Sequence, residues 1–178
     1  MKYLFTFVLL YRVKNCEIVK LEEFSGNQTS VYSIYIEEEE MTLYDRFVIE
    51  NKEQFLAEIN DINNRLISIG KIGARENFFK LKEGNPSDGV CALYDNPNSN
   101  LRLYCIRYGT SIVLIGGGGY KPKTISALQE DKKLKEENYF LRELSKEIKQ
   151  RMLDKELKFT TDYLDFEGDI NFNFNDDE

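Results

Sequence analysis

Four cationic side chains and three tyrosines lie within the stretch Leu101–Lys123. The cations are Arg102, Arg107, Lys121 and Lys123, and the tyrosines are Tyr104, Tyr108 and Tyr120. Cations interleaved with aromatic rings on a pair of strands are one way in which proteins hold a phosphodiester backbone and stack on exposed bases. An amphipathic hairpin with one solvated face contains the same residue types. The stretch therefore predicts either a site for a nucleic acid or an ordinary surface hairpin.

Several kinds of catalytic chemistry are excluded by the residues that the chain lacks. The sequence contains no histidine, and its cysteines, Cys16, Cys91 and Cys105, show no CxxC spacing. The usual zinc ligands and the Ser-His and Cys-His nucleophile pairs are therefore excluded, and we expect no metal site. Scattered cysteines in odd number favour reduced thiols in the cytoplasm. The acidic run Glu37–Glu40 indicates a solvated loop, because consecutive carboxylates point in different directions.

The segment GGGGYKPKT has only a superficial likeness to a phosphate-binding loop. A Walker A loop needs Gly-Lys-Ser/Thr at the start of a helix, whereas here Tyr120 precedes Lys121 and Pro122 follows. We therefore expect no nucleoside triphosphate and no other cofactor. The glycines Gly116–Gly119 indicate that the backbone passes close to a neighbouring strand or to a ligand.

The strands that carry these residues are predicted from apolar and β-branched runs separated by turns. Phe78–Leu81, Val90–Tyr94, Leu101–Tyr108 and Ser111–Ile115 form a four-strand antiparallel meander with short connections. The acids Glu83, Asp88 and Asp95 fall in its turns, and paired-carboxylate chemistry has no positive support.

Helices are predicted before and after the meander. One begins at Thr42, whose hydroxyl can cap it, and Asn51-x-x-Gln54 is a capping-box pattern that indicates a second. The apolar stripe of the second helix is Leu56, Ile59, Ile62, Leu66 and Ile69, and that of the closing helix is Leu134, Leu141, Leu144, Ile148 and Met152. The predicted fold class is α+β: helices followed by a four-strand antiparallel meander and a long C-terminal helix, with an extra N-terminal strand pair and an acidic tail.

The chain is predicted to form a single domain over residues 1–158, followed by a disordered acidic tail over 159–178. Residues 1–19 are interpreted as a mis-assigned start or an extra strand. Met1–Tyr11 is apolar, but it lacks a small-residue cleavage site and is too short to span a bilayer as a helix, so no membrane partner is expected. The tail either solubilises the chain or covers the basic hairpin as an antitoxin segment would.

The net charge of −7 is unevenly distributed along the chain. Residues 159–178 carry seven acids and no base, whereas residues 71–158 hold 17 bases against 12 acids, a net charge of +5. This asymmetry is compatible with an anionic partner for one half of the chain only, and it argues against broad nonspecific binding of nucleic acids.

The segments FFKL, VCALYD and LRLYCIRYGTSIVLIGGGGYKPK follow a strand and helices and precede a closing helix. In this order they resemble the RelE/ParE superfamily of bacterial toxins of type II toxin–antitoxin systems, nearest to HigB-like members. The matching positions are Lys80 and Leu81, Leu101 and Arg102, Ile112–Ile115, and Lys121 with Lys123. The resemblance covers roughly residues 43–155 in the order of elements.

The resemblance implies a compact domain that cuts messenger RNA on the ribosome without a metal and is neutralised by a cognate antitoxin. A base would activate the ribose 2′-OH, and cations would stabilise the charge on the phosphoryl oxygens. The implied roles are phosphate stabilisation for Arg102 and Arg107, acid–base chemistry for Lys121 or Lys123, and RNA binding for Lys80, Tyr104 and Tyr120. Two alternatives stay open: a non-enzymatic ParE-like toxin that binds a protein, and an unrelated interaction module in which the two arginines form salt bridges.

Overall fold

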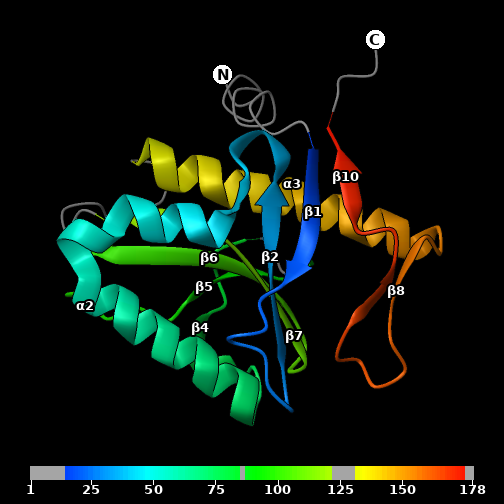
Figure 1. Ribbon diagram of the computed structural model, residues 1–178, viewed down its shortest axis with the longest axis horizontal. Coiled ribbons are helices and arrows are strands. Elements are labelled where there is room, and N and C mark those ends of the chain that lie inside the picture. Colours follow the sequence, from blue (N-terminus) through cyan, green and yellow to red (C-terminus); the bar gives the residue numbers. More distant parts are fainter. Residues whose placement is uncertain (1–14, 85–86, 122–130, 175–178) are drawn as a thin grey trace.

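The computed structural model describes residues 15–84, 87–121 and 131–174. The strands are β1 (Asn15–Lys20), β2 (Ser30–Ile36), β3 (Met41–Thr42), β4 (Phe79–Lys80), β5 (Val90–Leu93), β6 (Leu101–Tyr108), β7 (Ile112–Tyr120), β8 (Leu157–Phe159), β9 (Phe166–Gly168) and β10 (Asn171–Asn173). The helices are α2 (Leu43–Ile72) and α3 (Lys132–Leu153), with short 3₁₀ turns at Glu37–Glu39 and Glu76–Phe78. Figure 1 labels both helices and all of these strands except β3 and β9.

Eight of the strands form one mixed sheet, in the order β10-β1-β2-β7-β6-β5-β4, and β3 pairs with β2 beside this path. The pair β2–β7 is parallel, with Ser30 opposite Ile112 and Ser33 opposite Ile115. The other pairs of this sheet are antiparallel. The strands β8 and β9 form a separate small sheet. The parallel pair joins β2, from the N-terminal part of the chain, to β7, the last of the consecutive strands β4 to β7.

The two helices cover opposite faces of the large sheet (Figure 1). Along β6, Leu103 and Cys105 belong to the apolar cluster that α2 covers, whereas Tyr104 and Ile106 belong to the cluster that α3 covers. This alternation is what a strand dictates, since successive side chains point to opposite faces. The resulting architecture has three layers, with the sheet in the middle and its apolar residues buried on both faces.

The helix α2 begins where the sequence predicts. The Thr42 side chain accepts a hydrogen bond from the Asp45 N–H, and the Asp45 carboxylate accepts one from the Thr42 N–H, which completes a capping box. No second cap interrupts the helix: Asn51 lies within it and donates to the Phe47 carbonyl. The change of direction comes instead from a kink at Phe55, where φ is −129° and ψ is 37°.

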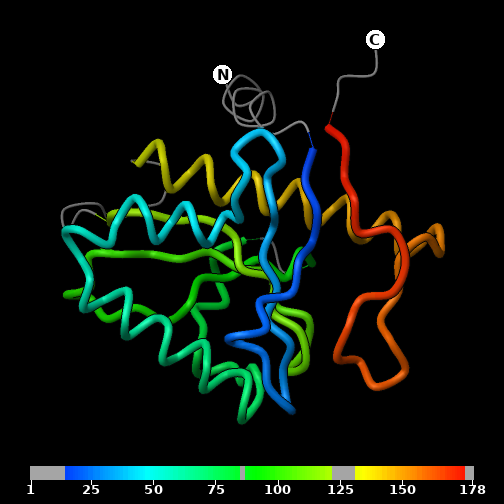
Figure 2. The backbone as a smooth tube through the Cα atoms, viewed as in Figure 1, coloured from blue at the N-terminus to red at the C-terminus, as the bar shows by residue number. Residues whose placement is uncertain are grey.

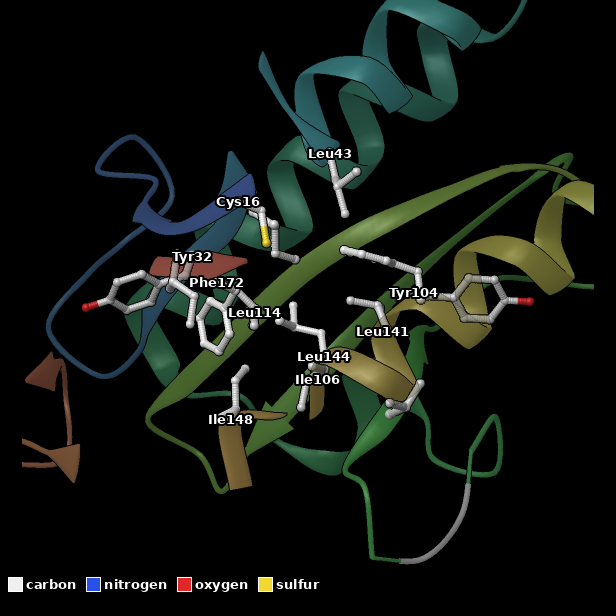
Figure 3. Close-up of a cluster of buried hydrophobic side chains, with 14 of the residues drawn as sticks. Cys16, Tyr32, Leu43, Tyr104, Ile106, Leu114, Leu141, Leu144, Ile148 and Phe172 are labelled. Carbon is white, nitrogen blue, oxygen red and sulfur yellow. The ribbon is translucent and has the colours of Figure 1, made fainter. Parts of the chain in front are cut away.

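Helix α3 packs its predicted apolar stripe on the sheet. Figure 3 shows Leu141, Leu144 and Ile148 of this helix against Ile106 and Leu114 of the sheet. The glycines of β7 permit this close packing, as the sequence predicts for a backbone that passes near a neighbour. A Cβ on Gly116 would lie 2.5 Å from a Leu141 methyl group, and one on Gly118 would lie 1.9 Å from the Arg102 carbonyl oxygen of β6.

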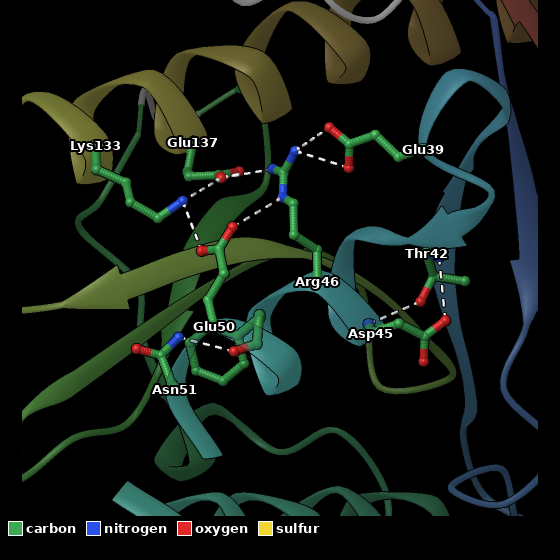
Figure 4. A network of polar contacts seen from close by, with 9 residues as sticks. Glu39, Thr42, Asp45, Arg46, Glu50, Asn51, Lys133 and Glu137 are labelled. Carbon is green, nitrogen blue, oxygen red and sulfur yellow. Dashed lines mark hydrogen bonds and ion pairs between the residues drawn. The ribbon is translucent and has the colours of Figure 1, made fainter. Parts of the chain in front are cut away.

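A partly buried network of charges joins the start of α2 to the start of α3 (Figure 4). The Arg46 guanidinium lies 2.6 Å from the Glu137 carboxylate, and the Lys133 ammonium group lies 2.9 Å from that of Glu50 and 3.4 Å from that of Glu137. Burial raises the pKa of Glu137, and the charges of Arg46 and Lys133 oppose that shift. The network fixes the N-terminal turns of both helices over the glycine segment of β7.

The predicted fold, helices followed by a four-strand antiparallel meander and a long C-terminal helix, with an extra N-terminal strand pair and an acidic tail, is wrong. The described residues form only two α-helices, and β4 to β7 are one half of an eight-stranded mixed sheet. The predicted N-terminal strand pair, β1 and β2, continues the same sheet through the parallel β2–β7 contact. The physical reason for the error is that local periodicity reports burial, whereas the pairing of strands far apart in sequence depends on tertiary contacts.

The acidic tail also differs from the prediction of a disordered segment, because residues 159–174 include the end of β8 and the paired strands β9 and β10. Strand β10 pairs with β1, so the red C-terminal strand runs beside the blue N-terminal one in Figure 2. Its Phe172 belongs to the apolar core. Aromatic side chains hold this acidic segment against the core: the ring centres of Phe159 and Phe166 lie 5.6 and 5.7 Å from that of Tyr108. Residues 1–14 and 175–178 lie outside the described part of the chain.

Candidate phosphate-binding site

Three cations, one from β4, one from β6 and one directly after β7, converge on one buried carboxylate. Asp95, in the connection between β5 and β6, forms an ion pair with Lys80 of β4 through Oδ1. Its Oδ2 accepts hydrogen bonds from Arg102 Nε of β6 at 3.2 Å and from Lys121 Nζ, directly after β7, at 3.1 Å. Only 4% of the Asp95 side chain is exposed, against 31% for that of Lys80. We call Lys80, Glu83, Asp95, Arg102 and Lys121 the Asp95 cluster.

The register of the sheet explains why these side chains meet. Lys80 lies opposite Ala92, Ala92 lies opposite Tyr104, and Arg102 lies opposite Gly119. Strand neighbours on one face have Cβ atoms about 5 Å apart, so residues in register, or two positions away, come within reach of each other. The neighbours of Lys80 and Arg102 in this row, Ala92 and Tyr104, belong to the apolar cluster on the α3 face. The cluster therefore sits on that face, at the end of the sheet where β6 begins.

A second carboxylate completes the cluster. Glu83 Oε1 lies 3.6 Å from Arg102 Nη1, and the Glu83 carbonyl accepts a hydrogen bond of 2.8 Å from the Asn138 side chain of α3. Burial raises the pKa of Glu83, although the charge of Arg102 opposes this shift. Burial acts in the same sense on Asp95, but hydrogen bonds from Lys80 and Arg102 hold the pKa of Asp95 below its usual value. Two carboxyl groups with pKa values moved in opposite directions are suited to different roles.

The aromatic residue beside the cluster is one that the sequence did not single out. Tyr94 is 46% exposed, and Lys80 Nζ lies 5.8 Å from the centre of its ring. An exposed ring next to a cation can stack on a base while the cation holds a phosphate. The alternation of side chains in the VCALYD segment could have indicated this position, because Tyr94 is two residues beyond Ala92 and lies on the same side as Lys80.

Neither of the two tyrosines predicted to bind RNA offers a free ring at the Asp95 cluster, although Tyr104 lies two residues from Arg102 on the same face of β6. Tyr104 is fully buried in the core, so its ring cannot stack on a base. Tyr120 is half-exposed, but its ring stacks on Phe55 of α2 at 5.8 Å and an interplanar angle of 8°, on the other face of the sheet. The pattern of aromatic residues in these strands therefore reflects core packing for Tyr104 and contact with α2 for Tyr120.

Arg107 does not join the other predicted cations. Its Nε donates a 2.8 Å hydrogen bond to the Ala74 carbonyl, and its guanidinium lies 5.8 Å from the ring centre of Phe79. Phe79 and Ala74 belong to the cluster on the α2 face. Arg102 and Arg107 are five residues apart in β6, which places them on opposite faces and about 17 Å apart along the strand. Lys123 lies outside the described residues, so of the four predicted catalytic cations the structure brings Arg102 and Lys121 together, and Lys80, predicted to bind RNA, joins them.

The Asp95 cluster carries three positive and two negative charges, a net charge of +1 from its own side chains. Such a site can attract one phosphate group, with guanidinium and ammonium donors already oriented by Asp95. Within residues 15–84, 87–121 and 131–174, no three or more acidic or cysteine side chains are grouped as ligands for a metal ion.

No protein-family model matches the chain, and searches of curated proteins and of solved structures find no match. Neither helix in the described part of the chain is both long and apolar enough to cross a membrane. The resemblance to RelE/ParE toxins therefore rests on the matching residues of the sequence, of which Lys80, Arg102 and Lys121 meet in one cluster.

Proposed function

We propose that the chain is a metal-independent endoribonuclease of RelE/ParE type that acts in the cytoplasm and is neutralised by a cognate antitoxin. The observation that carries this proposal is the convergence of Lys80, Arg102 and Lys121 on Asp95, with Glu83 beside Arg102. These three cations are also the described ones among the positions that resemble the toxin family. Arg107, which the geometry separates from the cluster, has no catalytic role in this proposal.

The cations of the cluster would hold the scissile phosphate. Arg102 offers a planar guanidinium, which matches two phosphoryl oxygens, and it is kept in place by the hydrogen bond to Asp95 Oδ2. Lys80 is the more exposed of the two lysines and would meet the incoming phosphate first. Charge that develops on the phosphoryl oxygens in the transition state is stabilised by such preoriented donors, typically by a factor of about 10² to 10³ per donor.

Glu83 is the candidate general base. A carboxylate with a raised pKa takes a proton more readily at neutral pH than an ordinary surface carboxylate does. In this role it removes the proton of the ribose 2′-OH, whose oxygen attacks the adjacent phosphorus and displaces the 5′-oxygen of the next nucleotide. The ammonium group of Lys121 gives a proton to that leaving oxygen. Asp95, with its lowered pKa, stays ionised and orients the cations.

The same ion pairs favour a second candidate, an interaction module in which the Asp95 cluster only stabilises the sheet. Each of the three cations has a carboxylate partner inside the protein, as expected of a structural network. The two candidates differ in one respect. A nuclease loses its activity when Glu83 is neutralised while the fold remains, whereas a structural network has no activity to lose.

The test is inducible expression of the chain and of two variants, with growth and messenger RNA integrity as readouts. Arg102→Ala and Glu83→Gln should each abolish growth arrest and lower RNA cleavage by purified protein in EDTA by about 10²-fold or more. Arg75→Ala is the matched control, because Arg75 is an exposed arginine outside the cluster, and it should behave as the unmodified chain.

Circular dichroism of each variant separates loss of activity from loss of fold. Growth arrest with intact RNA would support the protein-binding ParE-like alternative. Absence of arrest and of cleavage by the unmodified chain would leave the interaction module as the better description. Cleavage that survives in folded Glu83→Gln would contradict the assignment of the base.

A further inference from the structure

A groove with a volume of about 640 Å³ lies at the other end of β6 from the Asp95 cluster. Its walls come from the turn between β6 and β7, the C-terminal half of α3 and the loop after β8. The lining residues that matter here are Tyr108, Ile148, Lys149, Met152, Phe159 and Tyr163. Ligand sites for small molecules commonly measure about 300 to 1,000 Å³ and are lined mainly by apolar and aromatic groups.

The inner wall of the groove is apolar and partly aromatic. Ile148 and Met152 contribute aliphatic side chains from successive turns of α3. The ring of Phe159 lies 5.6 Å from that of Tyr108 and 6.3 Å from that of Tyr163. Rings presented at such angles favour a flat, apolar body that can contact their faces and edges.

Two polar groups of the groove lack partners in the described part of the chain. The Tyr108 hydroxyl oxygen is buried and has no hydrogen-bond partner there. Leaving a buried hydroxyl without a partner is unfavourable, so a ligand atom that accepts or donates a hydrogen bond would bind there. Lys149 is exposed at the rim, and no ion pair joins it to a described residue. The acid in the lining, Asp88, is already engaged by Arg142 at 3.3 Å.

Tyr163 is held at the rim in a conformation that its residue type disfavours. Its φ of +61° lies in the left-handed region, and its side chain is 64% exposed. The loop that holds it is closed by hydrogen bonds from Tyr163 N–H to the Thr160 carbonyl at 2.9 Å and from Leu164 N–H to the Asp162 carboxylate at 3.0 Å. A strained backbone that exposes a large ring beside a cavity motivates a functional role for that ring.

We propose that this groove binds a small organic anion with a flat apolar body, of the class of aromatic carboxylates and sulfonates. The body would lie against Met152, Phe159 and Tyr163, the anionic group would pair with Lys149, and a polar atom would meet the Tyr108 hydroxyl. The site is distinct from the Asp95 cluster and does not depend on the function proposed for it.

The probe is 8-anilino-1-naphthalenesulfonate, which joins an aromatic body to a sulfonate, titrated against the full chain by fluorescence and calorimetry. We expect a single site. Tyr163→Gly removes the ring and, because glycine adopts a positive φ without strain, should leave the melting temperature unchanged or raised while the Kd increases about tenfold. Lys149→Gln should raise the Kd about fivefold and make binding less sensitive to salt.

Lys155→Gly is the matched control, since Lys155 also has a φ of +61° but does not line the groove. It should match Tyr163→Gly in relieving backbone strain and should leave the Kd unchanged. Equal affinity of the unmodified chain and of Tyr163→Gly would overturn the proposal, as would binding of several probe molecules with no effect of Lys149→Gln. Absence of any binding of the probe would overturn it as well.

Discussion

Strand β6 carries a charged group near each end, and the two ends are built differently. At the first end, Arg102 faces α3 and shares Asp95 with two lysines of neighbouring strands. At the far end, Arg107 faces α2 and is engaged by a backbone carbonyl, while Tyr108 beside it lines a groove. One end thus gathers ionised groups that pair with each other beside the buried Tyr104 hydroxyl. The other end places the buried Tyr108 hydroxyl at an apolar groove, and neither hydroxyl has a hydrogen-bond partner among the described residues.

The difference shows how the same strand can serve two kinds of chemistry. A cluster of paired charges is preorganised, because its donors are already oriented before any substrate arrives. An apolar groove offers shape and contact area and depends on a few polar groups for orientation. The acidic C-terminal segment contributes to the second end only: Phe159 and Tyr163 line the groove. One of the two roles predicted for the tail was to cover the basic hairpin. Residues 159–174 do not cover the Asp95 cluster.

The largest effect on stability is expected at Asp95. Removing one partner of a buried ion pair typically costs about 3 to 5 kcal/mol, because the remaining charges stay buried without compensation. Asp95→Asn should therefore lower the free energy of unfolding by about 3 kcal/mol at pH 7, measured by urea denaturation. Asp61→Asn, which affects an exposed pair with Arg65, should change it by less than about 0.5 kcal/mol.

The pH dependence of this effect has a definite sign. The folded-state pKa of Asp95 lies below its usual value, so its stabilisation is fully present above the unfolded pKa of about 3.9. It is lost as the pH falls from about 4 through the folded-state pKa. The difference between the unmodified chain and Asp95→Asn should therefore shrink below pH 4. A difference that is constant from pH 7 to pH 3 would contradict the ion-pair assignment.

Some of the features that distinguish the two ends of β6 could be predicted from the sequence. The odd spacing between Arg102 and Arg107 already implies opposite faces of a strand, although the residue types suggested one patch. The cap at Thr42 and the stripe of α3 were also readable, because capping and helical periodicity are local. The partner of Arg102 was not: Asp95 falls in a turn, and its meeting with Lys80 and Lys121 depends on the register of four strands.

The groove could not be predicted from the sequence for a related reason. It requires residues of α3, of the β6–β7 turn and of the loop after β8 to meet in space. The segment after Phe159 shows no sustained period, because its strands are three residues long and are held by contacts with distant elements. Short strands stabilised by tertiary contacts carry almost no local signal.

Replacing Arg107 tests whether the two arginines are as different as their surroundings. Arg107→Ala removes a hydrogen bond to the Ala74 carbonyl and the contact with the Phe79 ring, and should cost about 2 kcal/mol in unfolding free energy. RNA cleavage should stay unchanged at a temperature where the variant is folded. Loss of cleavage in folded Arg107→Ala, to the extent expected for Arg102→Ala, would remove the distinction between the two ends.

The smallest effect is expected at Tyr108, and it has the opposite sign. The Tyr108 hydroxyl is buried without a hydrogen-bond partner in the described part of the chain, and burial raises the pKa of this phenol because the charged form is desolvated. Tyr108→Phe removes the unpaired group and keeps the ring contacts with Phe159 and Phe166, so it should raise the unfolding free energy by about 1 kcal/mol. The same variant should weaken binding of the sulfonate probe if the hydroxyl meets the ligand. A destabilised variant in urea denaturation would mean that this hydroxyl has a partner in the folded protein, and the groove would then offer no unpaired hydroxyl to a ligand.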